Sequence, residues 1–277
     1  MVLAGLLLGT GGCDEPRVAS SGAIWEHTKI GDLGPRVPDP NRRATFMGTI
    51  RFDVYAIDLP ADNIGKLDSV WEVLSAKPVR TNSYTAFAEN GFRVRFGRLQ
   101  TWKEVESLLA QAGGQGAGTT SLILSDTEPT DLPIADVPRS RSISFMATNL
   151  ATQIAHVDSG VLVLRLRAEP VPGARGVRKI IAYPTHTPPM SITIPELKAT
   201  ARQREFYFGS AAFAARMSPG DLVVLAPNRF TGERDSLGGL FFNKATGAVF
   251  PDPERRRPPE RKPTVRVFVL ICTRMGD

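Results

Sequence analysis

The residues that most often carry out catalysis are few in this chain and far apart. The histidines are His27, His156 and His186, and no two of them have the spacing of metal ligands. We expect all three on the surface or in loops. There is no Gly-x-Ser-x-Gly motif, and nothing in the sequence brings a pair of its 28 acidic residues together. We therefore predict that the protein is not an enzyme and uses no metal or other cofactor.

A glycine-rich run over residues 113–118 has the composition of a loop that cradles phosphate. It follows a predicted helix rather than a strand, and it lacks the lysine of a P-loop. The end of a helix and a loose connection explain the run better.

Basic residues form the other candidate site. Arg255, Arg256, Arg257, Arg261 and Lys262 lie in a proline-rich segment and are candidate contacts for an anionic surface. Five positive and three negative charges occur over residues 251–263, so the net charge of the segment is small. No aromatic residues alternate with the basic ones, which argues against single-stranded nucleic acid as a partner. We favour a solvated loop, and binding of anionic envelope components is the alternative.

The composition is that of a soluble, folded protein. Of the 277 residues, 42% are hydrophobic and 22% are charged, which excludes a disordered chain and one with several membrane spans. The 34 basic and 28 acidic side chains leave a net charge of +6. This mild excess suits an anionic partner, although no nucleic-acid partner is expected.

The N-terminal residues combine an apolar run with a cysteine. Apolar residues dominate positions 1–8, two glycines follow Thr10, and Cys13 comes next. The pattern resembles the end of a bacterial lipoprotein signal, in which the cysteine receives lipid. Basic residues are missing and Thr10 stands where leucine is usual, so we interpret residues 1–13 as a truncated signal. The resemblance implies a lipid-anchored protein of the bacterial cell envelope that faces the periplasm. A plain apolar terminus is the alternative.

The second cysteine, Cys272, ends an apolar run that predicts a buried strand over 265–271. If Cys13 carries lipid, Cys272 has no partner and no disulfide forms. A bridge between the two cysteines is the less favoured alternative.

The elements that would position these residues follow a linker. Residues 14–43 are rich in proline, glycine and serine, which is typical of a flexible tether. We predict a single α+β body over residues 44–277, with a helix-containing part over 44–138 and a strand-rich part over 139–277. An exposed loop is predicted over 251–263.

The first part of the body predicts the order β-α-β-β-α-β. Apolar and polar residues alternate over 50–56, as in a strand with one wet face, and apolar residues recur at helical spacing over 67–74. A hairpin is predicted over 84–96, because its Asn-Gly pair is a strong turn signal. A second amphipathic helix opens at Thr101 in a Thr-x-x-Glu capping box, and a strand follows over 121–124. Two helices could then cover one face of a sheet.

The second part is predicted to be mostly strands. Arg165 and Arg167 alternate with leucines, so their strand is expected to show one face to water. A helix is predicted over 205–217 because of its alanine-rich middle. The predicted strands cover 141–146, 161–167, 191–194, 221–225 and 265–271.

Several segments resemble, in order, those of the secretin module, the β-rich domain of ring-shaped outer-membrane gates in bacterial secretion. Residues 121–125 are similar to the strand before the family's S-x-P step, 161–167 to its V-x-L-x-L strand and 220–225 to its G-Q-T-V-V-L strand. Residues 237–242 resemble L-G-x-L-F, and 265–273 resemble the closing strand. The stretch that builds the membrane-inserting lip has no counterpart here. The resemblance implies a strand-rich, self-associating envelope protein without that lip.

Two functions of different classes follow. The first is a non-enzymatic, lipid-anchored, secretin-like structural or assembly component, whose partners are further copies or other envelope proteins. The alternative is a ligand-binding lipoprotein that captures a glycan or other anionic ligand on arginine-rich faces such as Arg93, Arg95, Arg165 and Arg167. Size separates the two, because a receptor can be a monomer whereas an assembly component associates.

Overall fold

The structure is a computed structural model that describes residues 48–189, 204–244, 247–250 and 260–276. All of these fall within Phe46–Asp277, one of two units into which the chain divides. The predicted signal with Cys13, the predicted linker, the strand predicted over 191–194 and Arg255, Arg256 and Arg257 lie outside the described residues.

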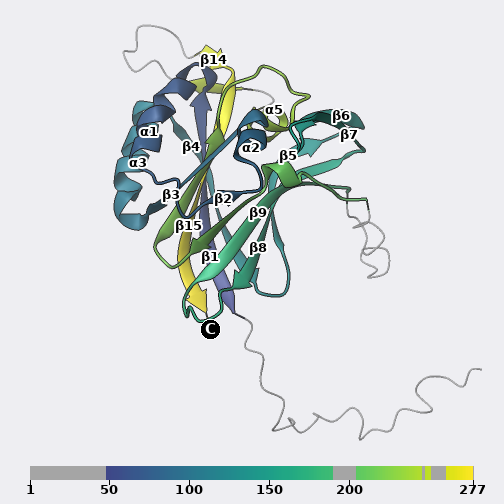
Figure 1. Cartoon of the computed structure of the whole chain (residues 1–277). Coiled ribbons are helices and arrows are strands. Elements are labelled where there is room, and N and C mark those ends of the chain that lie inside the picture. The colour runs from purple at the N-terminus through teal and green to yellow at the C-terminus, as the bar shows by residue number, and fades with distance from the viewer. Residues whose placement is uncertain (1–47, 190–203, 245–246, 251–259, 277) are drawn as a thin grey trace, which may run out of the picture. The chain divides into compact units, whose positions relative to one another are not determined.

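Two antiparallel sheets form the frame of this unit (Figure 1). The first has the order β3-β12-β15-β1-β4 and the second the order β2-β11-β9-β8-β5, with β10 also paired to β9. The strands of the first sheet are β1 (Thr49–Pro60), β3 (Phe92–Arg98), β4 (Gln115–Ser125), β12 (Asp221–Pro227) and β15 (Thr264–Gly276). Those of the second are β2 (Arg80–Thr81), β5 (Thr130–Val137), β8 (Gly160–Pro170), β9 (Arg178–Thr187), β10 (Phe206–Tyr207) and β11 (Phe213–Met217).

Two short ribbons and several short helices complete the unit. The ribbons pair β6 (Arg141–Met146) with β7 (Thr152–Val157) and β13 (Ala248–Phe250) with β14 (Glu260–Lys262). The α-helices are α1 (Asp68–Glu72), α2 (Tyr84–Glu89), α3 (Leu99–Gln111) and α5 (Leu237–Phe242), and the 3₁₀ turns are η3 (Ala61–Leu67) and η4 (Gly209–Ala211). The strand-rich composition with several sheets agrees with the predicted class.

Strand β15 lies at the centre of the first sheet because its residues are apolar on both faces. Val267 and Val269 belong to one core, and Phe268 and Leu270 to the other, and all four are buried. A strand without a polar face is stable only where both of its faces are covered. The run predicted to be a buried strand therefore takes the central position.

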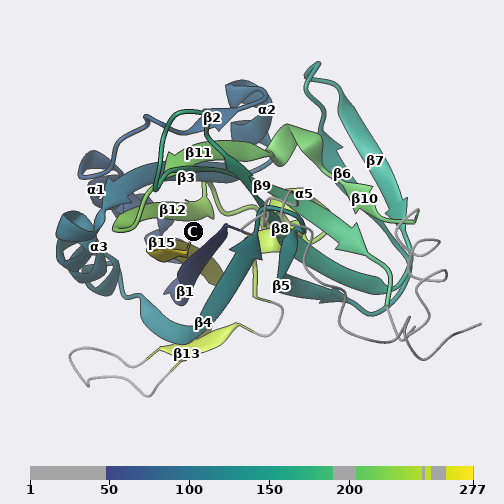
Figure 2. The same ribbon diagram turned by 90° about the horizontal axis from the view of Figure 1, so that it is seen from below.

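The two faces of the first sheet belong to different cores. Phe52 and Phe268 on one face pack with residues of the second sheet such as Leu164. On the other face, the core includes Trp71 of α1 and Leu109 of α3. Figure 2 shows α1 and α3 on the side of the first sheet that faces away from the second sheet. The unit thus has three layers: helices, first sheet and second sheet.

Helix α3 has the predicted apolar face, but it starts two residues earlier than predicted. It begins at Leu99, and the Thr101 hydroxyl donates a hydrogen bond to the carbonyl oxygen of Arg98 at 2.8 Å. Thr101 therefore lies inside the first turn rather than capping it. Gly113, with a φ of +82°, follows the helix as expected for a residue that must be left-handed.

The hairpin predicted over 84–96 is wrong in its first half, which forms helix α2. The Ser83 hydroxyl caps this helix by accepting a hydrogen bond from the Ala86 N–H at 3.2 Å. Phe87 is buried one helical turn from that cap. The Asn-Gly pair ends the helix, with Gly91 at a φ of +84°, instead of joining two strands. The order at the start is therefore β1-α1-β2-α2-β3-α3-β4 rather than β-α-β-β-α-β.

The helix predicted over 205–217 is also wrong, because this segment forms β10, η4 and β11. Within β11, Phe213, Ala215 and Met217 are buried, whereas Arg216 is exposed. That alternation has the two-residue period of a strand. Burial of every second side chain on the second sheet outweighs the weak helical preference of the alanines.

Two predicted loops are partly strand. Residues 115–118 were expected to be a loose connection but begin β4, where Gln115 pairs with Asp58 of β1. In the loop predicted over 251–263, Glu260–Lys262 forms β14 and pairs with β13. Neither segment has alternating apolar residues, so the usual strand signal is missing from both.

Candidate functional site

Strand β4 forms one end of the first sheet, and within the described residues no strand pairs with its outer side. In an edge strand, every second residue turns its N–H and C=O groups away from the sheet. Near the end of β4, the Thr130 hydroxyl donates to the carbonyl oxygen of Ile123 at 3.0 Å. Residues 116–121 are exposed without interruption. This part of the edge is accessible to an added strand.

The other three ends of the two large sheets have features that oppose strand addition. β3 carries three arginines, and Ser75 exchanges two backbone hydrogen bonds with Phe96 on its outer side, each 2.8 Å long. β5 contains Pro133 next to a register irregularity, and β2 has only two residues. β4 is eleven residues long and contains neither a charged residue nor a proline. β4 thus lacks charge and proline, two of the usual protections of an edge strand, although its pairing with β1 also has one register shift.

An apolar groove of about 440 Å³ lies beside this edge, between α3 and the end of the sheet. Tyr55 and Trp102 form one part of its lining, with ring centroids 5.2 Å apart. Ile57, Leu109 and Gly116 also line it. The groove lies on the face of the first sheet that α3 packs against, where Trp102 and Leu109 of the helix approach Tyr55 of β1.

Local backbone features place β4 close to α3. A Cβ at Gly114 would lie 2.7 Å from the carbonyl oxygen of Leu109 and 2.9 Å from a methyl group of Ile57. Only glycine therefore fits where the chain leaves the helix and enters the strand. The β1–β4 register shifts between Ala56 and Ile57, and such bulges increase the twist of an edge.

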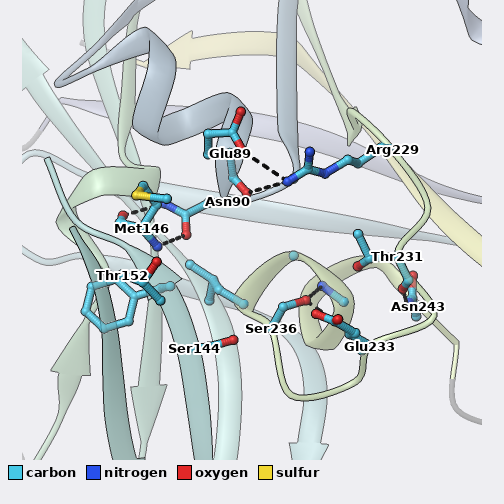
Figure 3. Close-up of a pocket in the computed structure, with 15 residues that line it drawn as sticks. Glu89, Asn90, Ser144, Met146, Thr152, Arg229, Thr231, Glu233, Ser236 and Asn243 are labelled. Carbon is cyan, nitrogen blue, oxygen red and sulfur yellow. Dashed lines mark hydrogen bonds and ion pairs between the residues drawn. The ribbon is translucent and has the colours of Figure 1, made fainter. Parts of the chain in front are cut away.

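A second cavity, of about 170 Å³, lies where α2, β6 and α5 meet (Figure 3). Asn90 donates to the carbonyl oxygens of Ala86 and Met146, both at 2.8 Å, and accepts from the Met146 N–H at 2.7 Å. Arg229 and Glu89 form an ion pair of 3.0 Å at the same cavity. These polar groups already bind one another, so the cavity is a structural junction rather than a prepared ligand site.

Of the five basic residues predicted to contact an anionic surface, only two are described. Arg261 pairs with Val249 in the β13–β14 ribbon, and Lys262 pairs with Ala248. They therefore lie on a short strand and not in an open loop. Arg261 is exposed and Lys262 is half-buried.

The arginine faces of the alternative hypothesis are largely neutralised. Arg165 is held between Asp131, in a bidentate pair at 2.7 and 2.8 Å, and Glu205. Hydrogen bonds to these two carboxylates raise the pKa of Arg165 above its ordinary value. Arg93 pairs with Asp68 at 3.0 Å. Little free positive charge is left at either position.

The remaining two arginines of that hypothesis differ in exposure. Arg167 is exposed and lies 3.6 Å from a Glu169 oxygen. Arg95 is half-buried and donates to the carbonyl oxygen of Val94. Burial and the charge of Arg93 lower the pKa of Arg95. The four arginines thus do not share one open cationic face.

Of the three histidines, the structure describes His156 and His186, whereas His27 lies outside the described residues. His156 is exposed, as predicted, and its Nδ1 lies 2.9 Å from the Ser142 hydroxyl. The prediction of a surface or loop position is wrong for His186, which is buried in β9. Among the described residues, no three His, Cys, Asp or Glu side chains are placed to hold a metal ion.

Asp58 is a buried charge that no sequence motif marks as functional. Lys244 and the guanidinium of Arg266 bind it at 2.8 and 2.7 Å. Burial raises the pKa of Asp58, but its hydrogen bonds to Arg266 and Lys244 outweigh that effect and hold the pKa below its ordinary value. The three residues come from β1, β15 and the segment after α5, so this cluster joins distant parts of the chain.

Across the described residues, no helix has the length and apolar character needed to cross a bilayer.

No protein family and no curated protein matches the chain. Among solved structures, the chain is similar to the type IV competence pilus secretin PilQ of V. cholerae, with 9% identity and a TM-score of 0.22. That match covers 83% of this chain and 61% of PilQ, so the chain spans less than two thirds of that protein. The type II secretin GspD of enteropathogenic Escherichia coli matches at 10% identity and a TM-score of 0.20, over 82% of this chain and 68% of GspD. The resemblance to secretins is distant, and scores this low assign neither fold nor function.

Proposed function

We propose that this protein is a non-enzymatic structural component of the bacterial cell envelope that self-associates through the edge of β4. The observation that carries the proposal is the open, uncharged edge over residues 116–121. Such an edge presents unpaired backbone groups, and pairing with another strand satisfies them.

A second copy of the chain is the partner that this edge fits. Two β4 strands related by a two-fold axis would pair antiparallel, and an interface of this kind uses the same patch on both copies. Because β4 carries no charge, its self-pairing brings no like charges together. The other ends of the large sheets are blocked, so pairing of β4 with itself closes the assembly at two copies.

The groove beside β4 adds side-chain contacts to this pairing. If the two-fold axis passes near Thr119, Ile123 of one copy comes opposite residue 115 of the other. Ile123 pairs with Arg51, and Thr119 pairs with Tyr55, so Ile123 lies on the face of the sheet that carries the groove. Each copy would then bury its exposed Ile123 against the groove of the other copy. Burying an isoleucine side chain contributes roughly 1.5–3 kcal/mol.

Attachment to the envelope through lipid on Cys13 is part of the same proposal and rests on the sequence pattern around that residue. A lipid anchor would place the body at a membrane surface and raise its local concentration there. Metabolic labelling with an alkyne fatty acid in a bacterial host tests it. Label is expected on the wild-type chain and not on the Cys13→Ser variant.

Light scattering after size-exclusion chromatography tests the self-association. The Cys13→Ser chain is expected to shift from one to two copies as its concentration rises through the micromolar range. Lysines on edge strands block pairing, so the added double substitution Ala117→Lys and Thr119→Lys is expected to keep it monomeric. Both positions are exposed, and circular dichroism checks that the fold is intact.

A charge-matched control carries Gln100→Lys on α3 and Gln153→Lys on β7, two exposed positions outside β4 and its groove, and is expected to dimerise like the parent. Association that is equally strong in the edge variant would contradict the proposal. A parent chain that stays monomeric throughout would contradict it as well.

A further inference from the structure

A cavity of about 320 Å³ lies on the outer face of the second sheet, away from the β4 edge. The strands β8, β9 and β10 and the turn η4 supply most of its lining. Its volume is within the range of small-molecule sites, which run from roughly 300 to 1,000 Å³. Its lining includes Arg165, Tyr183, Thr185, Glu205 and Tyr207.

Two tyrosines give this cavity an aromatic wall. The ring centroids of Tyr183 and Tyr207 are 6.2 Å apart, and the rings meet edge to face. Tyr207 is 67% exposed, so its ring contributes little to the core of the protein. A large exposed aromatic ring beside a cavity offers an apolar face with a polar hydroxyl at its tip.

Arg165 and Glu205 of the lining form a fixed cluster with Asp131, which does not itself line the cavity, and the three side chains have a net charge of −1. Arg165 donates to both oxygens of Asp131 and to both oxygens of Glu205. The side chains of Arg165 and Glu205 are each only 13% exposed, so the cluster is held rigidly. Two carboxylates around one guanidinium would repel an anion, and they leave acceptor oxygens for hydroxyl donors.

Thr185 supplies a polar group without a partner. Thr185 is 1% exposed, and its hydroxyl oxygen has no hydrogen-bond partner among the described residues. A buried hydroxyl without a partner destabilises the fold, so such groups are uncommon unless a site uses them. This one lies in the lining of the cavity, where Thr185 pairs with Tyr207 of β10 and with Val163 of β8, the strand that carries Arg165.

We propose that this cavity binds one unit of a neutral, hydroxyl-rich ring, which chemically is a sugar. The apolar face of the ring packs on Tyr207, and its hydroxyl groups bind Glu205 and Thr185. The proposal is independent of the β4 edge, because the cavity lies on the other sheet. An anionic sugar is excluded by the same cluster that orients a neutral one.

Calorimetric titration of the full chain with chitobiose, cellobiose and maltose, each alone, tests the proposal. At least one is expected to bind in saturable fashion. Tyr207→Ala is expected to weaken that binding by about fivefold or more, because it removes the aromatic face. Phe230→Ala, at another exposed aromatic residue that does not line the cavity, is expected to bind as the parent does.

Thr185→Val keeps the shape of the side chain and removes only the hydroxyl. It is expected to weaken binding by about threefold or more without lowering the melting temperature. Glucuronate, as the charged comparison, is expected to bind at least about tenfold more weakly than the neutral sugar. Failure of all three sugars to saturate, unchanged binding by Tyr207→Ala, or equal binding of glucuronate would each overturn the proposal.

Discussion

Ile123 is 64% exposed, whereas its neighbour Leu124 is fully buried in the core between the two sheets. The pair shows that β4 has one face in the core and one face open at the end of the first sheet. A large aliphatic side chain on an uncharged edge strand is what an isolated soluble protein usually avoids. A second copy of the chain could therefore pair with the edge of β4 and cover the exposed Ile123 side chain.

Replacing Asp58 by asparagine is expected to destabilise the protein by about 3 kcal/mol, because it leaves Lys244 and Arg266 without their shared counter-charge. The pKa of Asp58 is lowered in the fold, so its contribution is present above the ordinary value of 3.8 and is lost as the pH falls through the folded pKa. Urea unfolding of both proteins at several pH values measures this. The difference in the free energy of unfolding between the parent and the variant should shrink toward zero at acid pH.

Asp68→Asn is the matched control, since Asp68 is an exposed carboxylate paired only at the surface with Arg93. It is expected to cost less than about 1 kcal/mol. If Asp68→Asn lowered the free energy of unfolding as much as Asp58→Asn does, burial of the carboxylate would not explain the effect at Asp58.

The buried His186 makes stability depend on pH near neutrality. Burial lowers the pKa of His186, against a smaller opposite effect from Asp158, so the unfolded state takes up a proton more readily than the folded state. The free energy of unfolding should therefore fall as the pH drops below 6.5, with a slope of up to about 1.4 kcal/mol per pH unit. Chemical unfolding from neutral to mildly acid pH measures it. His186→Gln should lose this slope and His156→Gln should keep it; the opposite pattern would disprove the assignment.

The thiol of Cys272 is expected to be unreactive in the folded protein. Burial in β15, together with the nearby charge of Asp221, raises its pKa to about 12, so no useful fraction of thiolate forms near neutral pH. In a Cys13→Ser background, Ellman's reagent should label Cys272 only after denaturant is added. Rapid labelling of the native protein would contradict this and would show that the Cys272 thiol is reactive in the fold.

The sequence was a good guide where side-chain periodicity decides the structure. The apolar face of α3 and the two-sided apolar run of β15 are both local patterns, and both elements form as predicted. It failed at α2 and β11, where an Asn-Gly pair and an alanine-rich stretch are compatible with two conformations and tertiary packing chooses between them. Local signals are weak where burial against a distant sheet is worth more.

The candidate sites were harder to predict because they depend on long-range contacts. Asp131 and Glu205 lie 34 and 40 residues from Arg165 in the sequence. The residues next to Arg165 therefore do not indicate that its charge is neutralised. The openness of β4 follows from its place at the end of the strand order, which no local pattern reveals. The only hint was the absence of charge and proline over its eleven residues.

Amide hydrogen exchange of β4, followed by mass spectrometry at low and high protein concentration, tests the central claim most directly. Pairing of two β4 edges would protect the backbone amides that turn outward over residues 116–121. The account predicts slower exchange in this segment at high concentration, no such change in the blocked edge strand β5, and no concentration dependence in the Ala117→Lys and Thr119→Lys variant. Exchange over 116–121 that is the same at both concentrations while the protein dimerises would contradict the account.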